Sequence, residues 1–276
     1  MARKKQSFVP WWRRGLAWRL LRVFAMGCAG ALVVGCLVAD RLIFPVPEAS
    51  YPGEMAGLVW LPLRTGGEVP AIWRPRADAR WTVVYFHGNA MDLGHCNPMV
   101  NYLHRSLKCA VLCVEYPGYG PAGGSPSEEG CYAAADSAYD YLRTVRGVPA
   151  EQIALYGYSL GTGVAADLAA RVPAGALILE APFLSTFRVV TRVKIVPFDR
   201  FDNLSKIDGV RCPLLVIHGT ADKVVPFAHG QALFAAAKNA RRKQFLAIEG
   251  GAHVELRSRA PERFDETLAG FLSASE

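Results

Sequence analysis

The sequence predicts an α/β fold in which a mostly parallel sheet is covered by helices on both faces. Short and almost wholly apolar runs alternate with stretches of helical length along most of the chain, as expected of strand–helix–strand units with buried strands. A Gly-Tyr-Ser-Leu-Gly pentapeptide at 157–161 stands between such a run and a helical stretch. Of the 276 residues, 51% are hydrophobic, which is enough for one large core around a sheet.

The predicted elements follow one another in a regular order. Extended stretches at 57–61 and 69–74 predict an antiparallel entry hairpin. Six further strands are expected at 82–87, 109–115, 153–158, 175–180, 213–218 and 243–248, and helices at 97–107, 128–146, 161–171, 228–238 and 261–273. The segment from 181 to 212, between the strands expected at 175–180 and 213–218, mixes aromatic, aliphatic and basic residues. It is expected to form a small lid or an ordinary covering helix.

The pentapeptide Gly157–Gly161 has the form of a nucleophile elbow. An apolar strand at 153–156 precedes it and a helical stretch at 162–171 follows it. Such a turn presents a serine at the carboxyl end of the sheet, and small residues two positions before and after it let strand and helix approach closely. Ser159 is therefore the candidate nucleophile, although the bare pattern also occurs by chance.

A serine hydroxyl needs a base near neutral pH, and the base needs an acid that orients it. Asp222 follows one predicted buried strand and His253 follows the next, in the chain order serine, acid, histidine. Because both leave the carboxyl ends of parallel strands, we expect them to meet Ser159 in one crevice. Glu180, which ends the strand after the elbow, is the alternative acid, and His218 is interpreted as a structural strand cap.

Two backbone N–H groups are expected to hold the oxyanion that forms when the serine attacks a carbonyl. One belongs to Leu160, directly after the nucleophile, and the other to the loop that follows the third predicted strand. In that loop the N–H of Asn89 is the first choice and that of Ala90 the second. His87 and Gly88 are expected to shape the loop rather than to take part in the chemistry.

Five motifs carry a resemblance to a known enzyme family: His87–Gly94, Tyr116–Gly120, Gly157–Thr162, Ile217–Asp222 and Gly250–Leu256. With them the chain resembles α/β-hydrolase-fold serine hydrolases over roughly residues 55–272. The similarity is greatest to the small-lid branch that includes the α/β-hydrolase-domain protein depalmitoylases and their bacterial and protozoan relatives. The resemblance implies an α/β-hydrolase fold with a small lid and no cofactor. It also implies an acyl ester or thioester substrate, such as a lipidated protein or a lipid.

The net charge of the chain comes from its N-terminus. Residues 1–22 contain seven Lys or Arg and no acid, which leaves 24 basic and 24 acidic residues in the remainder. A charge of +7 would otherwise suggest a nucleic-acid partner. Because the remainder is formally neutral, the sequence argues against nucleic-acid binding. The seven cysteines show no metal-ligand spacing, so no metal site is expected, and the state of Cys96 and Cys131 is left open.

The basic stretch precedes a long uncharged run at residues 23–39. With its apolar flanks this run is long enough to span a bilayer. We therefore expect residues 1–44 to be a basic N-terminus with a single membrane anchor, residues 45–54 a linker, and residues 55–276 the catalytic domain. The positive-inside rule then makes the catalytic domain extracytoplasmic. A cleaved signal, lipoprotein processing at Cys36 and a buried soluble helix are the alternatives.

The function expected from these features is that of a membrane-anchored serine hydrolase that cleaves carboxylic ester or thioester bonds, as in protein depalmitoylation. Two other functions stay open. A peptidase of the prolyl-oligopeptidase type would share the three catalytic groups, although only about 55 residues precede the sheet here. A catalytically inactive binding module would keep the fold without the reaction.

Overall fold

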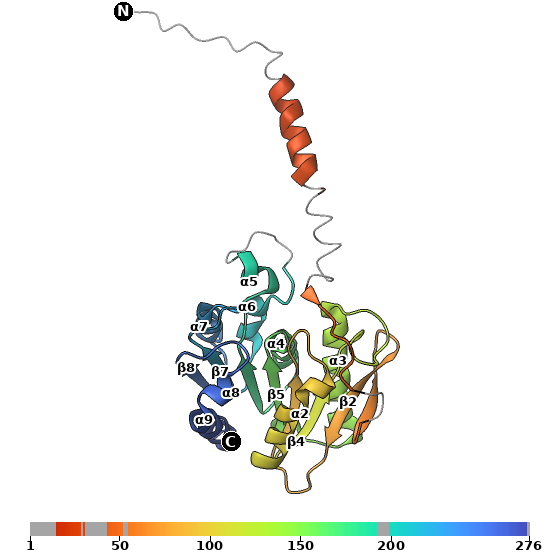
Figure 1. Ribbon diagram of the computed structural model, residues 1–276, viewed down its shortest axis with the longest axis vertical. Helices are drawn as coiled ribbons and strands as arrows, with labels where there is room; N and C mark the ends of the chain where they lie inside the picture. Colours follow the sequence, from red (N-terminus) through yellow and green to blue (C-terminus); the bar gives the residue numbers. More distant parts are fainter. Residues whose placement is uncertain (1–14, 29, 31–42, 52–54, 192–198, 275–276) are drawn as a thin grey trace, which may run out of the picture. The chain divides into compact units, whose positions relative to one another are not determined.

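The computed structural model describes residues 15–28, 30, 43–51, 55–191 and 199–274. The chain divides into two compact units, residues 1–43 and residues 44–276. In the described part of the second unit, eight strands form one sheet in the order β1-β2-β4-β3-β5-β6-β7-β8 (Figure 1). This unit contains every residue that the sequence proposes for the site.

The first two strands, β1 (Leu58–Pro62) and β2 (Glu68–Arg74), form the antiparallel hairpin that the sequence predicts. β2 also pairs antiparallel with β4, and all remaining pairs are parallel. The parallel strands are β3 (Thr82–Phe86), β4 (Ala110–Val114), β5 (Ile153–Tyr158), β6 (Ala176–Glu180), β7 (Leu214–Gly219) and β8 (Lys243–Ile248). Each strand lies within one residue of its expected bounds.

Helices cover both faces of the sheet. Alternate residues of a strand point to opposite faces, and in β3, β4 and β6 the residues on both faces are buried. Val83 and Tyr85 pack in a buried cluster with residues of α2 (Leu93–Asn101) and α9 (Pro261–Ser273). The buried residues of α3 (Glu128–Asp140), α4 (Gly161–Arg171) and α7 (Phe227–Ala236) lie outside that cluster and cover the other face. The expected α/β fold, with a mostly parallel sheet covered on both faces, is confirmed.

The helix bounds differ from expectation mainly at α2, which begins four residues before the predicted start at 97. Asp92 explains the earlier start, because it caps the helix by accepting a hydrogen bond from the backbone N–H of His95. The last turns of the two helices predicted at 97–107 and 128–146 are wider π-helical turns. These are η1 (Tyr102–Ser106) and η2 (Tyr141–Val145).

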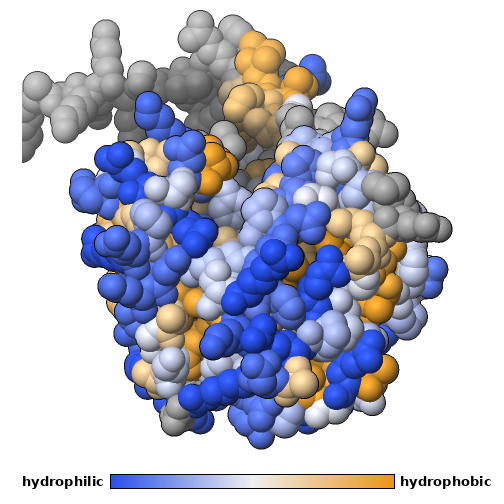
Figure 2. Space-filling view, turned by 60° about the horizontal axis from the view of Figure 1, so that its bottom comes forward, coloured by the Kyte–Doolittle hydropathy of each residue, from blue (hydrophilic) through white to orange (hydrophobic). Residues whose placement is uncertain are grey.

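The segment expected to form the lid is described in part. It contains the short helices α5 (Thr186–Thr191) and α6 (Asn203–Lys206), followed by the turn η4 (Ile207–Gly209). Residues 192–198 lie outside the described residues. At the base of the segment, the buried ring of Phe201 packs edge-on against the rings of Tyr132 and Phe183. Hydrophilic residues cover much of the face shown in Figure 2, with hydrophobic residues between them.

The predicted transmembrane helix needs correction. Among the described residues of the first unit, 15–28 and 30 are helical, and this helix includes Arg19 and Arg22. No helix within the described residues is long and apolar enough to cross a membrane. The predictions of a single-pass anchor and of the membrane location that depended on it are therefore wrong. Cys36 and most of the remaining uncharged run lie outside the described residues.

Candidate active site

Ser159 lies on the sharp turn between β5 and α4, with a φ angle of 50° that few non-glycine residues adopt. The turn requires glycine on both sides. A Cβ on Gly157 would lie 2.3 Å from the carbonyl oxygen of Gly161, and one on Gly161 would lie 2.0 Å from that of Phe86. The Ser159 N–H donates to the carbonyl oxygen of Glu180 at 2.9 Å, which fixes the strained turn to the neighbouring strand.

The structure brings Ser159, His253 and Asp222 into one hydrogen-bonded chain. Nε2 of His253 lies 2.9 Å from Oγ of Ser159, and Nδ1 of His253 lies 2.7 Å from Oδ2 of Asp222. Because a carboxylate only accepts hydrogen bonds, Nδ1 carries the hydrogen when the imidazole is neutral. Nε2 is then left to accept the proton of the serine hydroxyl. This is the arrangement that a nucleophilic serine requires.

Asp222 is itself held by the turn that follows β7. Its Oδ1 accepts hydrogen bonds from the backbone N–H groups of Val224 and Val225, each at 2.8 Å. Nε2 of the buried His218 lies 3.4 Å from Oδ2 and 3.1 Å from the carbonyl oxygen of Val225. Burial by itself raises the pKa of Asp222, but hydrogen bonds from His218 and His253 outweigh it and hold the pKa well below its usual range. Asp222 is therefore ionised throughout the neutral range.

Glu180, the alternative acid, makes a different contact. Its carboxylate accepts a hydrogen bond from the Tyr156 hydroxyl at 2.6 Å inside the sheet. Burial raises the pKa of Glu180 to about 7, although the Tyr156 hydrogen bond and the charge of His253 oppose the rise. The side chain that orients His253 by a hydrogen bond is that of Asp222, which follows the next strand, β7.

The two predicted oxyanion donors lie at the ends of β3 and β5. Leu160 precedes the first residue of α4, where free N–H groups and the helix dipole favour negative charge. Asn89 follows β3, and its side-chain Oδ1 accepts hydrogen bonds from the Tyr119 hydroxyl at 2.9 Å and from the Ala90 N–H at 3.1 Å. Asn89 and Ala90 both lie in this loop, and the sequence-based choice of Asn89 first and Ala90 second stays a prediction.

Tyr158 and Gly88 support the triad in a way that the sequence does not indicate. The Tyr158 hydroxyl donates to the carbonyl oxygen of His253 at 3.2 Å, and the two rings lie 5.7 Å apart between centroids. Gly88 makes room for the Tyr158 ring, because a Cβ there would lie 2.9 Å from it. The motif allows any residue at the position of Tyr158, so no sequence pattern could have indicated its contact with His253.

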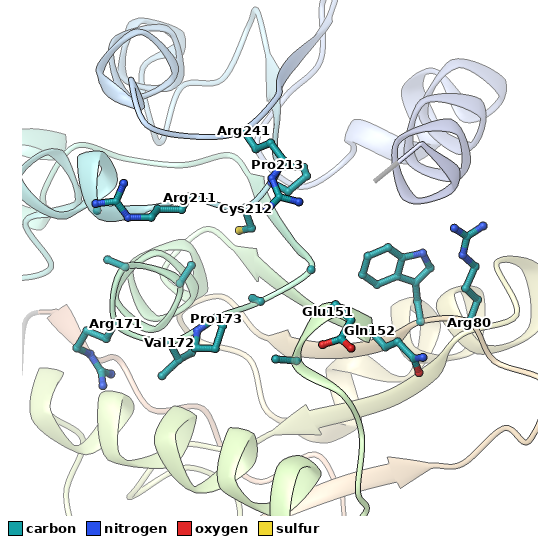
Figure 3. Close-up of a pocket in the computed structure, with 17 residues that line it drawn as sticks. Arg80, Glu151, Gln152, Arg171, Val172, Pro173, Arg211, Cys212, Pro213 and Arg241 are labelled. Carbon is teal, nitrogen blue, oxygen red and sulfur yellow. The ribbon is translucent and has the colours of Figure 1, made fainter. Parts of the chain in front are cut away.

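A cavity of about 740 Å³ lies at the opposite end of the sheet (Figure 3). Its lining comes from segments that precede β3, β5, β6, β7 and β8, including Arg80, Glu151, Gly175, Pro213 and Arg241. The three side chains around Ser159 follow the carboxyl ends of strands instead. The cavity is thus separate from the candidate active site.

The sheet order, the elbow and the hydrogen-bonded serine, histidine and aspartate that follow the carboxyl ends of strands define a serine hydrolase of the α/β-hydrolase fold. The family model described as alpha/beta hydrolase fold matches residues 82–189, and that of the prolyl oligopeptidase family matches residues 190–274. Alpha/beta hydrolase domain-containing protein 17B of Xenopus laevis is 40% identical over 196 residues, which are 70% of this chain and 67% of the relative. The chain belongs to the α/β-hydrolase family and, within it, groups with these domain-containing 17 proteins.

A second relative is similar over a smaller share of its length. The human alpha/beta hydrolase domain-containing protein 17C is 40% identical over 197 residues, which are 70% of this chain and 59% of the relative. The matched region thus spans about two thirds of the frog relative and less of the human one.

Solved structures share the fold at low sequence identity. An esterase of Pyrococcus furiosus, Pf2001, superposes with a TM-score of 0.71 at 16% identity over 83% of this chain and 97% of its own. Est1E of Butyrivibrio proteoclasticus, solved with ferulic acid bound, has a TM-score of 0.64 at 17% identity over 79% and 98%. A puromycin-hydrolyzing peptidase of Mycobacterium tuberculosis has a TM-score of 0.66 over 79% of this chain but only 39% of its own.

Proposed function

We propose that the protein hydrolyses carboxylic esters or thioesters through a triad of Ser159, His253 and Asp222. The observation that carries this proposal is the hydrogen-bonded chain from Oγ of Ser159 through His253 to Asp222, with contacts of 2.9 and 2.7 Å. Membership of the α/β-hydrolase family supports the same chemistry.

In the first half of the reaction, Oγ of Ser159 attacks the acyl carbon while Nε2 of His253 takes its proton. The imidazolium that results is stabilised by Asp222, which is already ionised and fixed by two backbone N–H groups. The N–H groups of Leu160 and Asn89 donate to the developing oxyanion. His253 then gives its proton to the leaving alcohol or thiol, and the acyl group stays on Ser159.

In the second half, water attacks the acyl-enzyme and the same groups act again. His253 takes a proton from the water, and Ser159 leaves as a hydroxyl. The oxyanion donors act in both halves, and removal of one such donor typically costs roughly 2.7–4 kcal/mol of transition-state stabilisation. The products are a carboxylic acid and the restored enzyme.

The substrate class follows from the family rather than from the site alone. The motifs resemble those of protein depalmitoylases, so a long-chain thioester on a protein is the proposed substrate, with lipid esters as the nearest chemical alternative. Both present an acyl carbon to Ser159, with a thiol as the leaving group in the thioester and an alcohol in the ester.

The test uses the full chain and its Ser159→Ala variant. A fluorophosphonate probe should label the wild type at one serine and leave the variant unlabelled. Short-chain and long-chain p-nitrophenyl esters, a palmitoyl thioester and a peptide amide should then be offered side by side. Turnover of the ester and thioester by the wild type alone supports the proposal, and labelling without turnover of any of them contradicts it. Absence of both would indicate an inactive binding module.

A second function is favoured by one specific observation. Residues 190–274, which contain Asp222 and His253, match the prolyl oligopeptidase family model. A peptidase would use the same triad on an amide, whose leaving group is poorer and depends more on proton donation from His253. The peptide in the substrate panel decides between the two, since a peptidase would cleave it at a rate comparable to the ester.

A further inference from the structure

The segment at residues 44–51, here called the strap, begins the second unit and packs against the rest of it. Both of its ends are buried and most of its middle is exposed, with Phe44 at 4% and Tyr51 at 7% exposure. The Phe44 ring packs edge-on against that of Phe201, 6.1 Å between centroids. The sequence suggested only an extended linker here. Residues 87–92, which follow β3 and contain Asn89, are here called the oxyanion loop. The strap makes specific contacts to this loop and to a side chain that supports it.

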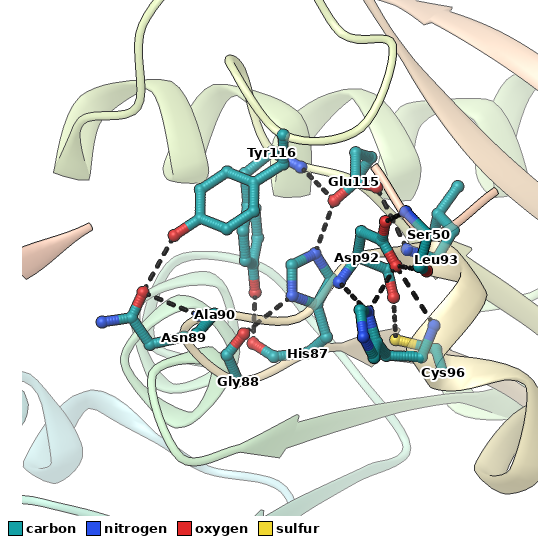
Figure 4. A network of polar contacts seen from close by, with 12 residues as sticks. Ser50, His87, Gly88, Asn89, Ala90, Asp92, Leu93, Cys96, Glu115 and Tyr116 are labelled. Carbon is teal, nitrogen blue, oxygen red and sulfur yellow. Dashed lines mark hydrogen bonds and ion pairs between the residues drawn. The ribbon is translucent and has the colours of Figure 1, made fainter. Parts of the chain in front are cut away.

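Glu115, which follows β4, connects the strap to this loop, and Figure 4 shows its contacts with His87 and Leu93. Its Oε2 accepts the Tyr51 hydroxyl and the Leu93 N–H, each at 3.1 Å. Its Oε1 lies 2.8 Å from Nε2 of His87, and both side chains are fully buried. One carboxylate therefore joins the strap, the first residue of α2 and the first residue of the oxyanion loop.

His87 is held as a cation in this network. Nδ1 lies 2.9 Å from the carbonyl oxygen of Gly88, and Nε2 faces the Glu115 carboxylate. Both neighbouring atoms are acceptors, so both ring nitrogens carry a hydrogen and the ring is an imidazolium. Burial by itself lowers the pKa of His87, but the charge and hydrogen bond of Glu115 raise it to about 9. The cation is thus pinned at both nitrogens to the start of the loop.

The other end of the oxyanion loop is also tied to the strap. The Ser50 N–H donates to Oδ2 of the buried Asp92 at 2.6 Å, and the Ser50 hydroxyl donates to Oδ1. Oδ1 also accepts from the His95 N–H at 3.2 Å, so the same carboxylate caps α2. The contact is close, because a Cβ on Gly94 would lie 2.3 Å from Oγ of Ser50. The strap therefore holds both ends of the loop.

We propose that the strap is a positioning element of the active site, which holds the Asn89 N–H where the oxyanion forms by fixing His87 through Tyr51–Glu115 and Asp92 through Ser50. This rests on the function proposed above, because it assigns Asn89 to the oxyanion. Tyr51 and Ser50 touch no reacting group. Their effect is to remove freedom from the loop, so that the donor is oriented before the substrate arrives. Loss of the strap contacts should therefore lower kcat more than it raises KM.

The test is Tyr51→Phe in the full chain, which removes one hydroxyl and keeps the buried ring. Tyr139→Phe is the matched control, since Tyr139 has the same 7% exposure and donates to the carbonyl oxygen of Pro173 at 2.7 Å, remote from the loop in the fold. For Tyr51→Phe we expect kcat on a soluble ester to fall roughly tenfold, the size expected for a hydrogen bond to a charged group, with KM within about twofold. The control should keep wild-type kcat.

Hydrogen–deuterium exchange of residues 87–92 gives a readout that does not depend on activity. Exchange should be faster than wild type in Tyr51→Phe and unchanged in Tyr139→Phe. Ser50→Ala, at an exposed position, is a second variant if the first folds poorly, and it should show the same changes to a smaller degree. Unchanged exchange in the loop, or faster exchange with unchanged kcat, would overturn the positioning role. If the wild type hydrolyses no ester, the proposed function fails while the exchange result still decides whether the strap holds the loop.

Discussion

The two sides of the candidate active site are held in different ways. On the triad side, each side chain belongs to a turn that directly follows its own strand, and hydrogen bonds of 2.9 and 2.7 Å join the three turns. On the oxyanion-loop side, the loop after β3 is fixed by a buried ion pair and by Tyr51, which is 64 residues away in sequence from its partner Glu115. The first side is built from local turns and the second from distant segments.

The difference matters because the two sides have different tasks. In the proposed mechanism the triad moves a proton to and from the substrate, so its groups must be reachable, and the His253 side chain keeps 11% exposure. The loop only has to keep an N–H group still, so its supports can be fully buried, as His87 and Glu115 are. Changes on the triad side should therefore affect the rate directly. Changes on the loop side should affect stability and the rate together.

The largest expected effect is on the triad side, at the nucleophile. Ser159→Ala removes one oxygen at a turn whose shape depends on Gly157 and Gly161, so the fold should remain. We expect a loss of about 10⁴–10⁶ in kcat, as is typical when a triad member is removed. Steady-state kinetics on a soluble ester, with the melting temperature as a control for folding, measures it. Retention of more than a few per cent of wild-type activity would show that Ser159 is not the nucleophile.

Asp222→Asn should give the next largest effect. The amide can still fill the site, but it can donate where His253 donates, so the imidazole loses its orientation and the stabilisation of its charge. We expect kcat to fall by about 10⁴. The double variant with Ser159→Ala should be little worse than Ser159→Ala alone, because residues that act as a unit are not additive. An additive double variant would show that Asp222 acts apart from the serine.

Much of the triad side could be predicted from sequence because it depends on local patterns. The Gly-x-Ser-x-Gly turn, the apolar strands before Asp222 and His253, and the chain order of the three groups are all visible without coordinates. The strands of the sheet were predictable for the same reason, since buried parallel strands are short apolar runs. What the sequence left open was the choice of acid, since Glu180 and Asp222 both follow strands. The contact to His253 distinguishes them.

The supports of the oxyanion loop could not be predicted, because they join segments with no shared pattern. Nothing around Tyr51 or Ser50 indicates a partner 64 or 42 residues later. The prolines of the strap favour a linker, and the sequence predicts a later start for α2 because it does not show that Asp92 caps this helix. The N-terminal error has a different cause. The uncharged run and the basic stretch beside it suggested a membrane span, whereas the described helix at 15–28 includes two arginines.

On the loop side, the sharpest test is the pH dependence of stability. The pKa of His87 is raised in the folded protein to about 9, above its ordinary value of 6.5. A raised pKa contributes stability that is complete below about pH 6.5 and is lost as the pH rises through about 9. Glu115→Gln removes the charge that causes the rise. Between pH 6.5 and pH 10, its stability deficit relative to wild type should therefore be largest at pH 6.5 and smaller by up to a few kcal/mol at pH 10.

Urea unfolding of both proteins at several pH values measures this difference, and groups that titrate alike in the two proteins cancel. The loss of the Tyr51 and Leu93 hydrogen bonds adds a deficit that does not change with pH. A deficit that is constant from pH 6.5 to 10 would mean that His87 is not held as a cation, and that the loop side is fixed by neutral hydrogen bonds alone.

The smallest effect on rate is expected at Glu180. This residue ends β6, next to the turn that carries Ser159, but its carboxylate makes no hydrogen bond to His253 among those described. Glu180→Gln keeps an acceptor for the Tyr156 hydroxyl and leaves Asp222 in place, so kcat should stay within about twofold of wild type. Stability should respond instead. Burial raises the pKa of Glu180 to about 7, so its contribution to stability is lost as the pH rises from about 4.5 through 7. The glutamine has no such loss, and the variant should gain stability relative to wild type over that range in urea unfolding. A large fall in kcat with intact folding would transfer the role of the acid to Glu180 and remove the distinction between the two carboxylates on which the triad assignment depends.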